Sequence, residues 1–282
     1  MSNANLSIRD ALYEAPGPQT RRWTAIGTGI SLAALGVLAA GVIRQFYITG
    51  QFGSKYWSLF TKGTTWKFIG RGIAGTLGVA AASGIVTFIL AFLLMVGRIS
   101  NYKILSKIST VLSEFTRGVP TLLFIYFFLL VVPQFGIILP AFWKIAAPVS
   151  ISACGVVAEV LRSGVNAVPK GQSEAALSIG MRETNVFLKV IFPQALRYVI
   201  PALISELVIV VKDTTFAYVV SYPDLMQNAK VLISNYDALL SVYLVVAVIY
   251  ILINYLINRA SDFAARRRNR TLAVSQGNAA KQ

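Results

Sequence analysis

The run from Gly72 to Gly97, GIAGTLGVAAASGIVTFILAFLLMVG, holds 26 consecutive residues without a charge. A helix needs about 20 residues to cross the hydrocarbon core of a bilayer, so this run predicts a membrane-spanning helix. Glycine and alanine are dense along it, and several of them lie four positions apart or nearly so. Small residues at that spacing let helix backbones approach closely, so the run also predicts a bundle of packed helices.

Five further apolar runs give the chain six expected spans. These spans cover about 24–45, 72–97, 112–132, 143–162, 196–220 and 238–258. The third run is interrupted by Pro120, Pro133 and Pro140, which predicts one helix that ends near Val132 and a loop after it. Pro120 itself is either a gate element or a plain kink. The predicted fold class is an all-α integral membrane protein with six transmembrane helices.

The composition agrees with a membrane protein and excludes other classes. Of the 282 residues, 56% are hydrophobic and 13% are charged, whereas soluble domains carry about 25% charged residues. This hydrophobicity excludes a disordered chain and argues against a soluble enzyme. The net charge of +15 invites a nucleic-acid interpretation, but the basic residues lie between apolar runs, which favours a membrane orientation signal instead. With one cysteine, Cys154, and no histidine, we expect no internal disulfide and no metal site.

The basic residues predict how the chain is oriented in the membrane. Of the 26 Lys and Arg residues, 17 fall in loops on the face that holds both termini and seven on the other face, while Arg117 and Lys212 lie at or within spans. Basic loops are retained in the cytoplasm, so both termini are expected there. The expected organisation is a cytoplasmic tail over 1–23, a transmembrane domain over 24–262 and a basic cytoplasmic tail over 263–282.

One segment of the predicted cytoplasmic face differs from the other loops. Residues 168–201 read VPKGQSEAALSIGMRETNVFLKVIFPQALRYVIP. The alanines of Gln172–Ile179 predict a short helix, and Gly180 predicts its end. A second helical piece is expected over Glu183–Ile191, before Pro193 opens the next span. The first helix either lies in a groove of a partner protein or serves as an amphipathic connector at the membrane surface.

This segment resembles a known family signature. Glu174, Ala175 and Ala176, followed by Gly180 and Pro193, resemble the EAA motif of binding-protein-dependent ABC importer permeases. That motif ends in Ile-x-Leu-Pro, and this chain has the conservative variant VIFP at the same place.

Flanking stretches are similar to the polar amino-acid subfamily of these permeases, over about 70–266. They read EFTRGVPTLL, VAEVLRSGVNAVPKGQ and LVIVVKDTTF, the last preceded by PQAL and Pro201. Two positions depart from the subfamily, which usually has Tyr where Val156 stands and Asn where Ser205 stands, so the substrate could differ. The N-terminal LYEAPGPQTRR resembles the start of one of the two permeases of actinobacterial glutamate-uptake systems.

The resemblance implies a type I ABC importer permease fold, with a cytoplasmic EAA coupling helix in the loop 169–193. It implies two ATP-binding subunits that dock on Glu174, Ala175, Ala176 and Gly180, and an extracytoplasmic solute-binding protein. ATP and Mg belong to the partner ATPase, since this chain has no GxxxxGK[ST] phosphate loop, is not expected to be an enzyme and holds no cofactor. A second permease subunit is also implied, with a heterodimer favoured over a homodimer, in the lipid of the bacterial plasma membrane.

Ionisable residues inside spans are costly and therefore indicate function. The predicted substrate pathway consists of Arg117, Glu159, Arg162, Glu206, Lys212, Asp213 and Thr214. Its basic groups would face the carboxylates of an amino acid, and the acids of the fifth span would face its ammonium. The alternative is structural, because Glu114 and Arg117, like Glu159 and Arg162, are three residues apart and could pair on one helix face.

The predicted function is ATP-driven import of a polar amino acid. Glutamate is the predicted substrate, and glutamine or a basic amino acid is the alternative. A secondary transporter or channel is the rival from another class, and it would work without an ATPase. A membrane-embedded enzyme is disfavoured because the chain has no histidine and no nucleophile–base pair.

Overall fold

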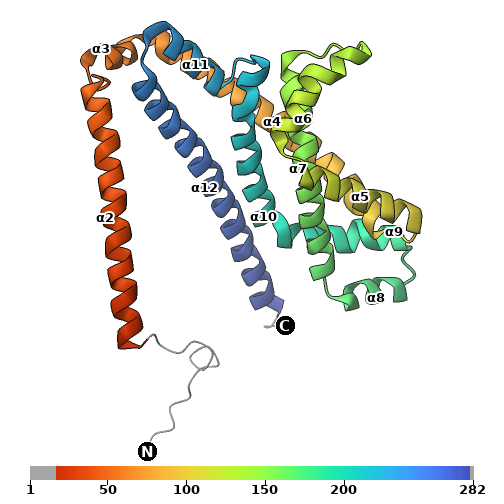
Figure 1. The fold of residues 1–282 in the computed structure, drawn as a ribbon. Helices are drawn as coiled ribbons and strands as arrows, with labels where there is room; N and C mark the ends of the chain where they lie inside the picture. The colour runs from red at the N-terminus through yellow and green to blue at the C-terminus, as the bar shows by residue number, and fades with distance from the viewer. Residues whose placement is uncertain (1–16, 280–282) are drawn as a thin grey trace, which may run out of the picture. The chain divides into compact units, whose positions relative to one another are not determined.

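The computed structural model describes residues 17–279, with side chains for residues 17–260, and every regular element in that part is helical. The chain divides into two compact units between Tyr56 and Trp57. Within the described residues, five helices are long and apolar enough to cross a membrane, or six spans result if one bent pair counts as a span. The predicted all-α membrane fold is confirmed (Figure 1).

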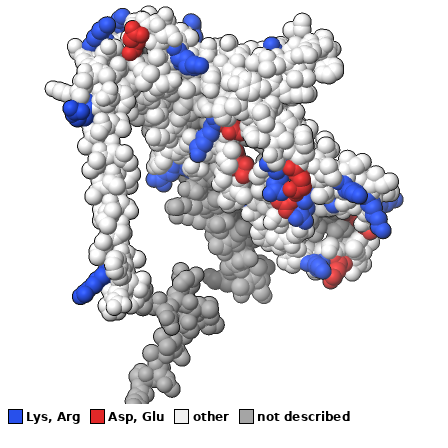
Figure 2. Space-filling model, in the orientation of Figure 1, with Lys and Arg blue, Asp and Glu red and all other residues white. Residues whose placement is uncertain are grey.

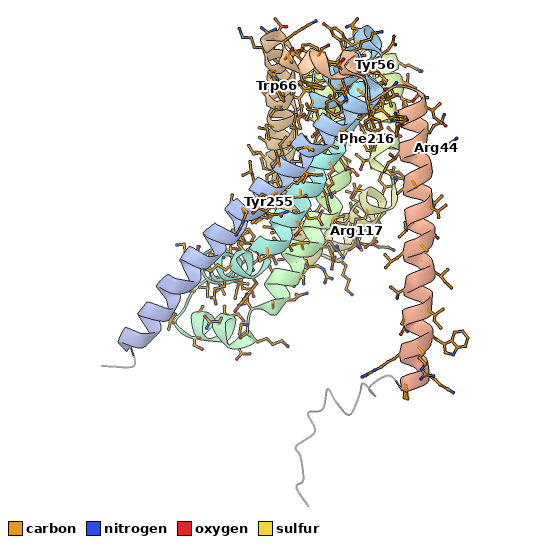
Figure 3. The ribbon with its side chains drawn as sticks, turned by 90° about the vertical axis from the view of Figure 1, so that its left-hand side faces the viewer. Arg44, Tyr56, Trp66, Arg117, Phe216 and Tyr255 are labelled. Atoms are coloured by element: carbon orange, nitrogen blue, oxygen red, sulfur yellow. The ribbon has the colours of Figure 1, made fainter. Side chains whose placement is uncertain are left out.

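The first unit contains one long helix. α2 (Pro18–Ile48) includes the predicted span 24–45, and its length and composition suffice to cross a membrane. Figure 2 shows α2 without charge along most of its length, with basic side chains near its ends. Arg44, near the end of α2, projects outward from the helix (Figure 3). A turn with a left-handed Gly50 then leads to the short α3 (Ser54–Trp57).

Three long helices form the core of the second unit. They are α4 (Gly63–Ile99), α7 (Ala141–Ala167) and α10 (Phe192–Asp213), and the 3-10 turn η1 (Ser58–Thr61) precedes them. Two clusters of buried apolar side chains hold them together, and each cluster takes side chains from all three helices. The clusters are centred on Val79, Val149 and Val210 and on Met95, Leu161 and Val199.

Small residues bring these helices close together. Ser83 of α4 donates a hydrogen bond to the carbonyl of Ala146 at 3.2 Å, and Ser150 of α7 donates one back to the carbonyl of Ser83 at 3.2 Å. A Cβ atom at Gly164 would lie 2.8 Å from the carbonyl oxygen of Ala195 on α10, so only glycine fits there. The packed bundle that the small residues predicted is therefore present.

The prediction of a single helix over 112–132 is wrong. The chain forms α5 (Lys103–Gly118) and, after a break, α6 (Thr121–Tyr126), and the two arms are bent by 97°. α6 continues into a π-helical turn, η2 (Phe127–Val131), and a 3-10 turn, η3 (Val132–Phe135). The region has the length and composition of a span only when both arms are counted together.

Pro120 causes the bend. Proline has no backbone N–H to continue a helix, and it disfavours the helical conformation in the residue before it. Val119 is accordingly extended, with φ −94° and ψ 124°, and α5 ends at Gly118. The proline breaks the helix completely rather than kinking it.

α8 (Lys170–Ser178) is the short helix predicted at Gln172–Ile179, and it follows the last turn of α7 (Figure 1). Gly180 comes next in a left-handed conformation, with φ +84°, as expected at a helix end. α9 (Glu183–Val186) and a π-helical turn, η4 (Phe187–Ile191), lead directly into α10. We call this end of the bundle the α8 end.

η5 (Thr214–Val220) and α11 (Leu225–Tyr236), the two elements directly after α10, lie at the opposite end, which we call the α11 end (Figure 1). α10 tightens into the 3-10 turn η5, and α11 follows it. α12 (Leu239–Ala279) then packs on α10 and runs back toward the α8 end, and it contains the predicted span 238–258.

Buried polar contacts fix α11 against the first half of α4. Thr76 accepts a hydrogen bond from the backbone N–H of Leu225 at 3.1 Å. Asn228 donates a hydrogen bond to the carbonyl of Phe68 at 2.8 Å. Since these groups are shielded from water, breaking the contacts would leave them unsatisfied, and α11 is therefore firmly placed.

Candidate functional site

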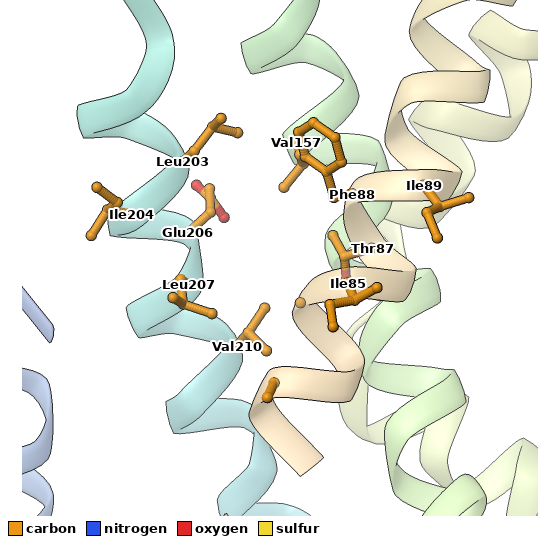
Figure 4. Close-up of a pocket in the computed structure, with 12 residues that line it drawn as sticks. Ile85, Thr87, Phe88, Ile89, Val157, Leu203, Ile204, Glu206, Leu207 and Val210 are labelled. Carbon is orange, nitrogen blue, oxygen red and sulfur yellow. The ribbon is translucent and has the colours of Figure 1, made fainter. Parts of the chain in front are cut away.

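A cavity of about 550 Å³ lies between α4, α7 and α10 (Figure 4). Its walls are mainly apolar and include Phe88, Val157 and Leu207. Thr87 and Glu206 add the polar side chains of the lining. Figure 4 shows Glu206 on the side of α10 that faces the other two helices, so the structure places this predicted pathway residue at a cavity.

The charge of Glu206 is not balanced within the described part of the chain. The ion pairs found there all involve other acids. The same residues contain no group of three or more His, Cys, Asp or Glu placed to hold a metal ion. Because water screens charges poorly inside an apolar cavity, a carboxylate there attracts a cationic group strongly.

Asp213, two helical turns beyond Glu206, belongs to a polar network between three helices. Its Oδ2 accepts a hydrogen bond from Thr121 Oγ1 at 2.9 Å, and Thr121 Oγ1 lies 2.8 Å from Ser152 Oγ of α7. Thr121 is the first residue of α6, so the break at Pro120 places its hydroxyl beside α10. Neither the Thr121 nor the Ser152 hydroxyl was among the site residues predicted from the sequence. A threonine directly after a helix-breaking proline was a usable signal for Thr121, whereas nothing in the pattern marked Ser152.

Two predicted neighbours of Asp213 are placed differently. Lys212 is exposed, whereas Asp213 is half-buried, because consecutive residues lie about 100° apart around a helix. Thr214 is fully buried, and its hydroxyl donates to the carbonyl of Val211 at 2.7 Å. The Thr214 hydroxyl proton is thus already used within the chain.

The predicted arginines form ion pairs. Arg117 Nη1 lies 3.2 Å from Glu114 Oε1 on the exposed surface of α5. Arg162 Nη2 lies 2.6 Å from Glu159 Oε1, and Arg98 Nη1 of α4 lies 2.6 Å from the other oxygen of the same carboxylate. Arg98 was not among the predicted site residues, because the predicted span ends at residue 97 and leaves Arg98 in the following loop. The pairs of Arg117 with Glu114 and of Arg162 with Glu159 are those that the structural alternative expects, and a role in the substrate pathway stays a prediction.

The predicted coupling residues on α8 differ in their exposure. Ala176 is buried and anchors the helix, whereas Glu174 and Ala175 are exposed. Leu177 and Ile179 are also exposed. α8 therefore offers a carboxylate and apolar side chains to a partner.

Comparison with known proteins identifies the family. Residues 87–270 match the model of the binding-protein-dependent transport system inner membrane component. The match covers more than half of the chain, and the chain belongs to this family of membrane permeases.

Within this family, the chain is similar to permeases for amino acids. The chain is 33% identical over 210 residues to the glutamate transport system permease protein GluD of Corynebacterium glutamicum, covering 73% of this chain and 77% of that protein. It is 32% identical over 203 residues to the probable glutamine ABC transporter permease protein GlnP of Bacillus subtilis, covering 71% and 91%. It is also 32% identical over 211 residues to the L-cystine transport system permease protein TcyB of Bacillus subtilis, covering 74% and 89%.

A solved transporter structure is similar to this chain as well. The crystal structure of an amino acid ABC transporter with histidines matches with a TM-score of 0.68 and 25% identity, covering 74% of this chain and 98% of that one. Together with the family match, this similarity defines the chain as the permease of an amino-acid ABC importer. The family's mode of action implies an ATPase and a solute-binding protein as partners.

Proposed function

We propose that this permease imports a polar amino acid, with glutamate as the first substrate to test. The proposal is supported by the identity with a glutamate permease and by the N-terminal stretch LYEAPGPQTRR. Glutamine and cystine permeases are similar to nearly the same degree, so the substrate has to be measured directly.

Glu206 carries the proposal at the level of the site. Every amino acid has an ammonium group, and an uncompensated carboxylate at an apolar cavity binds such a group strongly. Asp213 provides a second acidic position along α10. Of the three predicted basic groups, Lys212 is exposed and forms no ion pair within the described residues, so it can meet a substrate carboxylate. The other predicted pathway residues, Arg117, Glu159, Arg162 and Thr214, already have partners within the chain, so they support the proposal less than Glu206 does.

A basic amino acid is the second candidate. Two acids on one helix, neither of them in an ion pair within the described residues, suit a substrate with two positive groups. Glutamate, in contrast, brings two carboxylates, and the basic groups predicted to receive them at Arg117 and Arg162 are already paired.

The proposed coupling site is α8. Two ATP-binding subunits, which hold ATP and Mg, dock on this helix through Glu174, Ala175, Ala176 and the turn at Gly180. A second, different permease subunit completes the pathway, and an extracytoplasmic solute-binding protein delivers the substrate. In this arrangement the chain crosses the bacterial plasma membrane several times, with α8 and both termini in the cytoplasm, as the distribution of basic residues supports.

Uptake by the reassembled transporter tests the proposal. Permease pair, ATPase and solute-binding protein are reconstituted in proteoliposomes, and uptake of labelled glutamate, glutamine and arginine is compared. Glu206→Gln is expected to lower uptake about tenfold or more, the factor for one lost charge-assisted hydrogen bond. Leu207→Met, in the lining of the same cavity, is the matched control and should retain uptake.

The outcomes separate the alternatives. Unchanged uptake with Glu206→Gln would exclude Glu206 from the pathway. Uptake without ATPase subunits would instead support a secondary transporter or channel. Preferential uptake of arginine would select the basic amino acid.

A further inference from the structure

A polar cleft of about 390 Å³ lies at the α11 end of the second unit. It is formed by η5, the turn after it and α11. Its polar lining consists of Tyr218, Ser221, Gln227, Lys230, Ser234 and Asn235. The cavity at Glu206, by comparison, has mainly apolar walls, so the two hollows suit different occupants.

Lys230 is the basic group of this cleft. Its ammonium lies 4.1 Å from the centroid of the Tyr218 ring. A cation–π contact of this kind positions a cation, but unlike an ion pair it leaves the positive charge unneutralised. Lys230 forms no ion pair in the part of the chain that the structure describes.

The other polar side chains of the cleft are also available for hydrogen bonds to a partner. Among the described residues, the side chains of Ser221, Gln227, Ser234 and Asn235 form no hydrogen bond within the chain. Ser221 is held in a left-handed conformation, φ 53°, which is uncommon for a residue with a side chain. These hydroxyl and amide groups can therefore donate hydrogen bonds to an anionic group beside Lys230.

The α11 end of the second unit carries further basic residues. Four further cations of the second unit lie at the α11 end, in the first turns of α4 and α7 or directly before α4. They are Lys62, Lys67, Arg71 and Lys144. Asp237 is the exposed acid of the adjoining turn, whereas Asp224 is buried.

We propose that this cleft docks an acidic face of the solute-binding protein, with one of that protein's carboxylates against Lys230. The inference rests on the proposed function, which places the α11 end outside the cell. Opposite charges on two docking surfaces steer encounter and fix the register of the complex.

The chemistry of the cleft argues against two other occupants. A free amino acid would need an acid for its ammonium, and no acid lines the cleft. A lipid tail would need apolar walls, which the cleft lacks. A protein carboxylate needs only a cation and neighbouring hydrogen-bond donors, and these are present.

Charge reversal in the assembled transporter tests the docking surface. Lys230→Glu is expected to weaken binding of the solute-binding protein about tenfold or more, because like charges then face each other. ATPase activity without the binding protein should stay unchanged. Lys230→Arg should restore binding, and the loss should shrink at high salt.

Lys62→Glu is the matched control. Lys62 belongs to the same basic end, but its ammonium lies 5.2 Å from the centroid of the Tyr236 ring, outside the cleft. We expect it to weaken binding much less than Lys230→Glu. A carbodiimide, which joins amines to carboxylates in contact, should couple Lys230 to an acid of the binding protein, and mass spectrometry would locate the link.

Unchanged affinity of the Lys230→Glu variant for the solute-binding protein would overturn the proposal, as would equal losses of affinity in Lys230→Glu and Lys62→Glu. A cross-link that maps to a residue other than Lys230 would also overturn it. So would a loss of affinity in Lys230→Glu that disappears in vesicles without anionic lipid. Failure of the proposed function itself would look different, because the unmodified transporter would then respond to no solute-binding protein at all.

Discussion

Glu159 joins α4 to α7 by charge. It accepts hydrogen bonds from Arg98 and Arg162, and the Arg98 side chain is only 10% exposed. Removing this acid leaves Arg98 without compensation in a place that water hardly reaches, which costs more than the loss of a surface pair. We expect Glu159→Gln to lower the free energy of unfolding by about 2 kcal/mol, measured as thermal unfolding in mild detergent.

Glu114→Gln is the control for that measurement. The substitution is the same, and Glu114 also pairs with an arginine three residues away, but both side chains are exposed. A surface pair contributes at most about 1 kcal/mol, so the loss should be clearly smaller. Equal losses for the two variants would show that Arg98 does not depend on Glu159.

Asp224 is a fully buried acid outside the spans, and it caps α11 by accepting a hydrogen bond from the N–H of Gln227 at 2.7 Å. Burial raises its pKa to about 6. Since this pKa is higher than in the unfolded chain, the contribution to stability is complete below about pH 4 and is lost as the pH rises through about 6. Asparagine keeps the capping oxygen without the charge, so Asp224→Asn should stabilise the protein above pH 7, by at most about 3 kcal/mol.

Unfolding at two pH values tests this expectation. The free energy of unfolding of Asp224→Asn should exceed that of the unmodified protein clearly at pH 7.5, and the two values should be nearly equal at pH 4. Asp224→Ala, which removes the cap as well, should be about 1 kcal/mol less stable than the asparagine variant at both. A pH-independent gain for asparagine would contradict a raised pKa.

At the scale of elements, one residue determines the shape of the segment between α4 and α7. Replacing Pro120 by alanine restores a backbone N–H and allows Val119 to become helical. We expect α5 and α6 to straighten, so that the distance between spin labels at Lys107 and Leu130 grows by about 10 Å from the helical rise alone. The Thr121 hydroxyl would then leave Asp213, and uptake should fall.

Pro140→Ala is the matched control, since Pro140 precedes α7 and lies outside the labelled segment. It should leave the distance unchanged. If Pro120→Ala also leaves it unchanged, tertiary contacts and not proline hold the bend.

The sequence predicted these elements to different degrees for physical reasons. Uncharged runs of span length, such as that of α4, and a glycine that ends an alanine-rich helix, such as Gly180, are local signals and were interpreted correctly. Thr121 and Asp213 are 92 positions apart, so no local pattern indicates their hydrogen bond. Arg98 was missed for a related reason, because α4 continues past its apolar run and carries the arginine to Glu159.

At the scale of the whole molecule, the distribution of basic residues predicts which end faces the cytoplasm. Thiol labelling tests it in a chain whose single buried cysteine is removed by Cys154→Ala. Ser178→Cys, exposed on α8, should react with a membrane-impermeant reagent only from the cytoplasmic side. Ser234→Cys, exposed on α11, should react only from the outside, and labelling of both from one side would contradict the proposed orientation.

The π-helical turn η4 has a mechanical consequence for the path from α8 to α10. A π-helical turn accommodates one residue more than an α-helical turn. If α10 absorbed that residue at η4, everything beyond it would rotate by about 100° and shift by about 1.5 Å. Glu206 would then turn away from the cavity that it now lines. A small axial displacement of α10 at η4 would therefore change which of its side chains line this cavity.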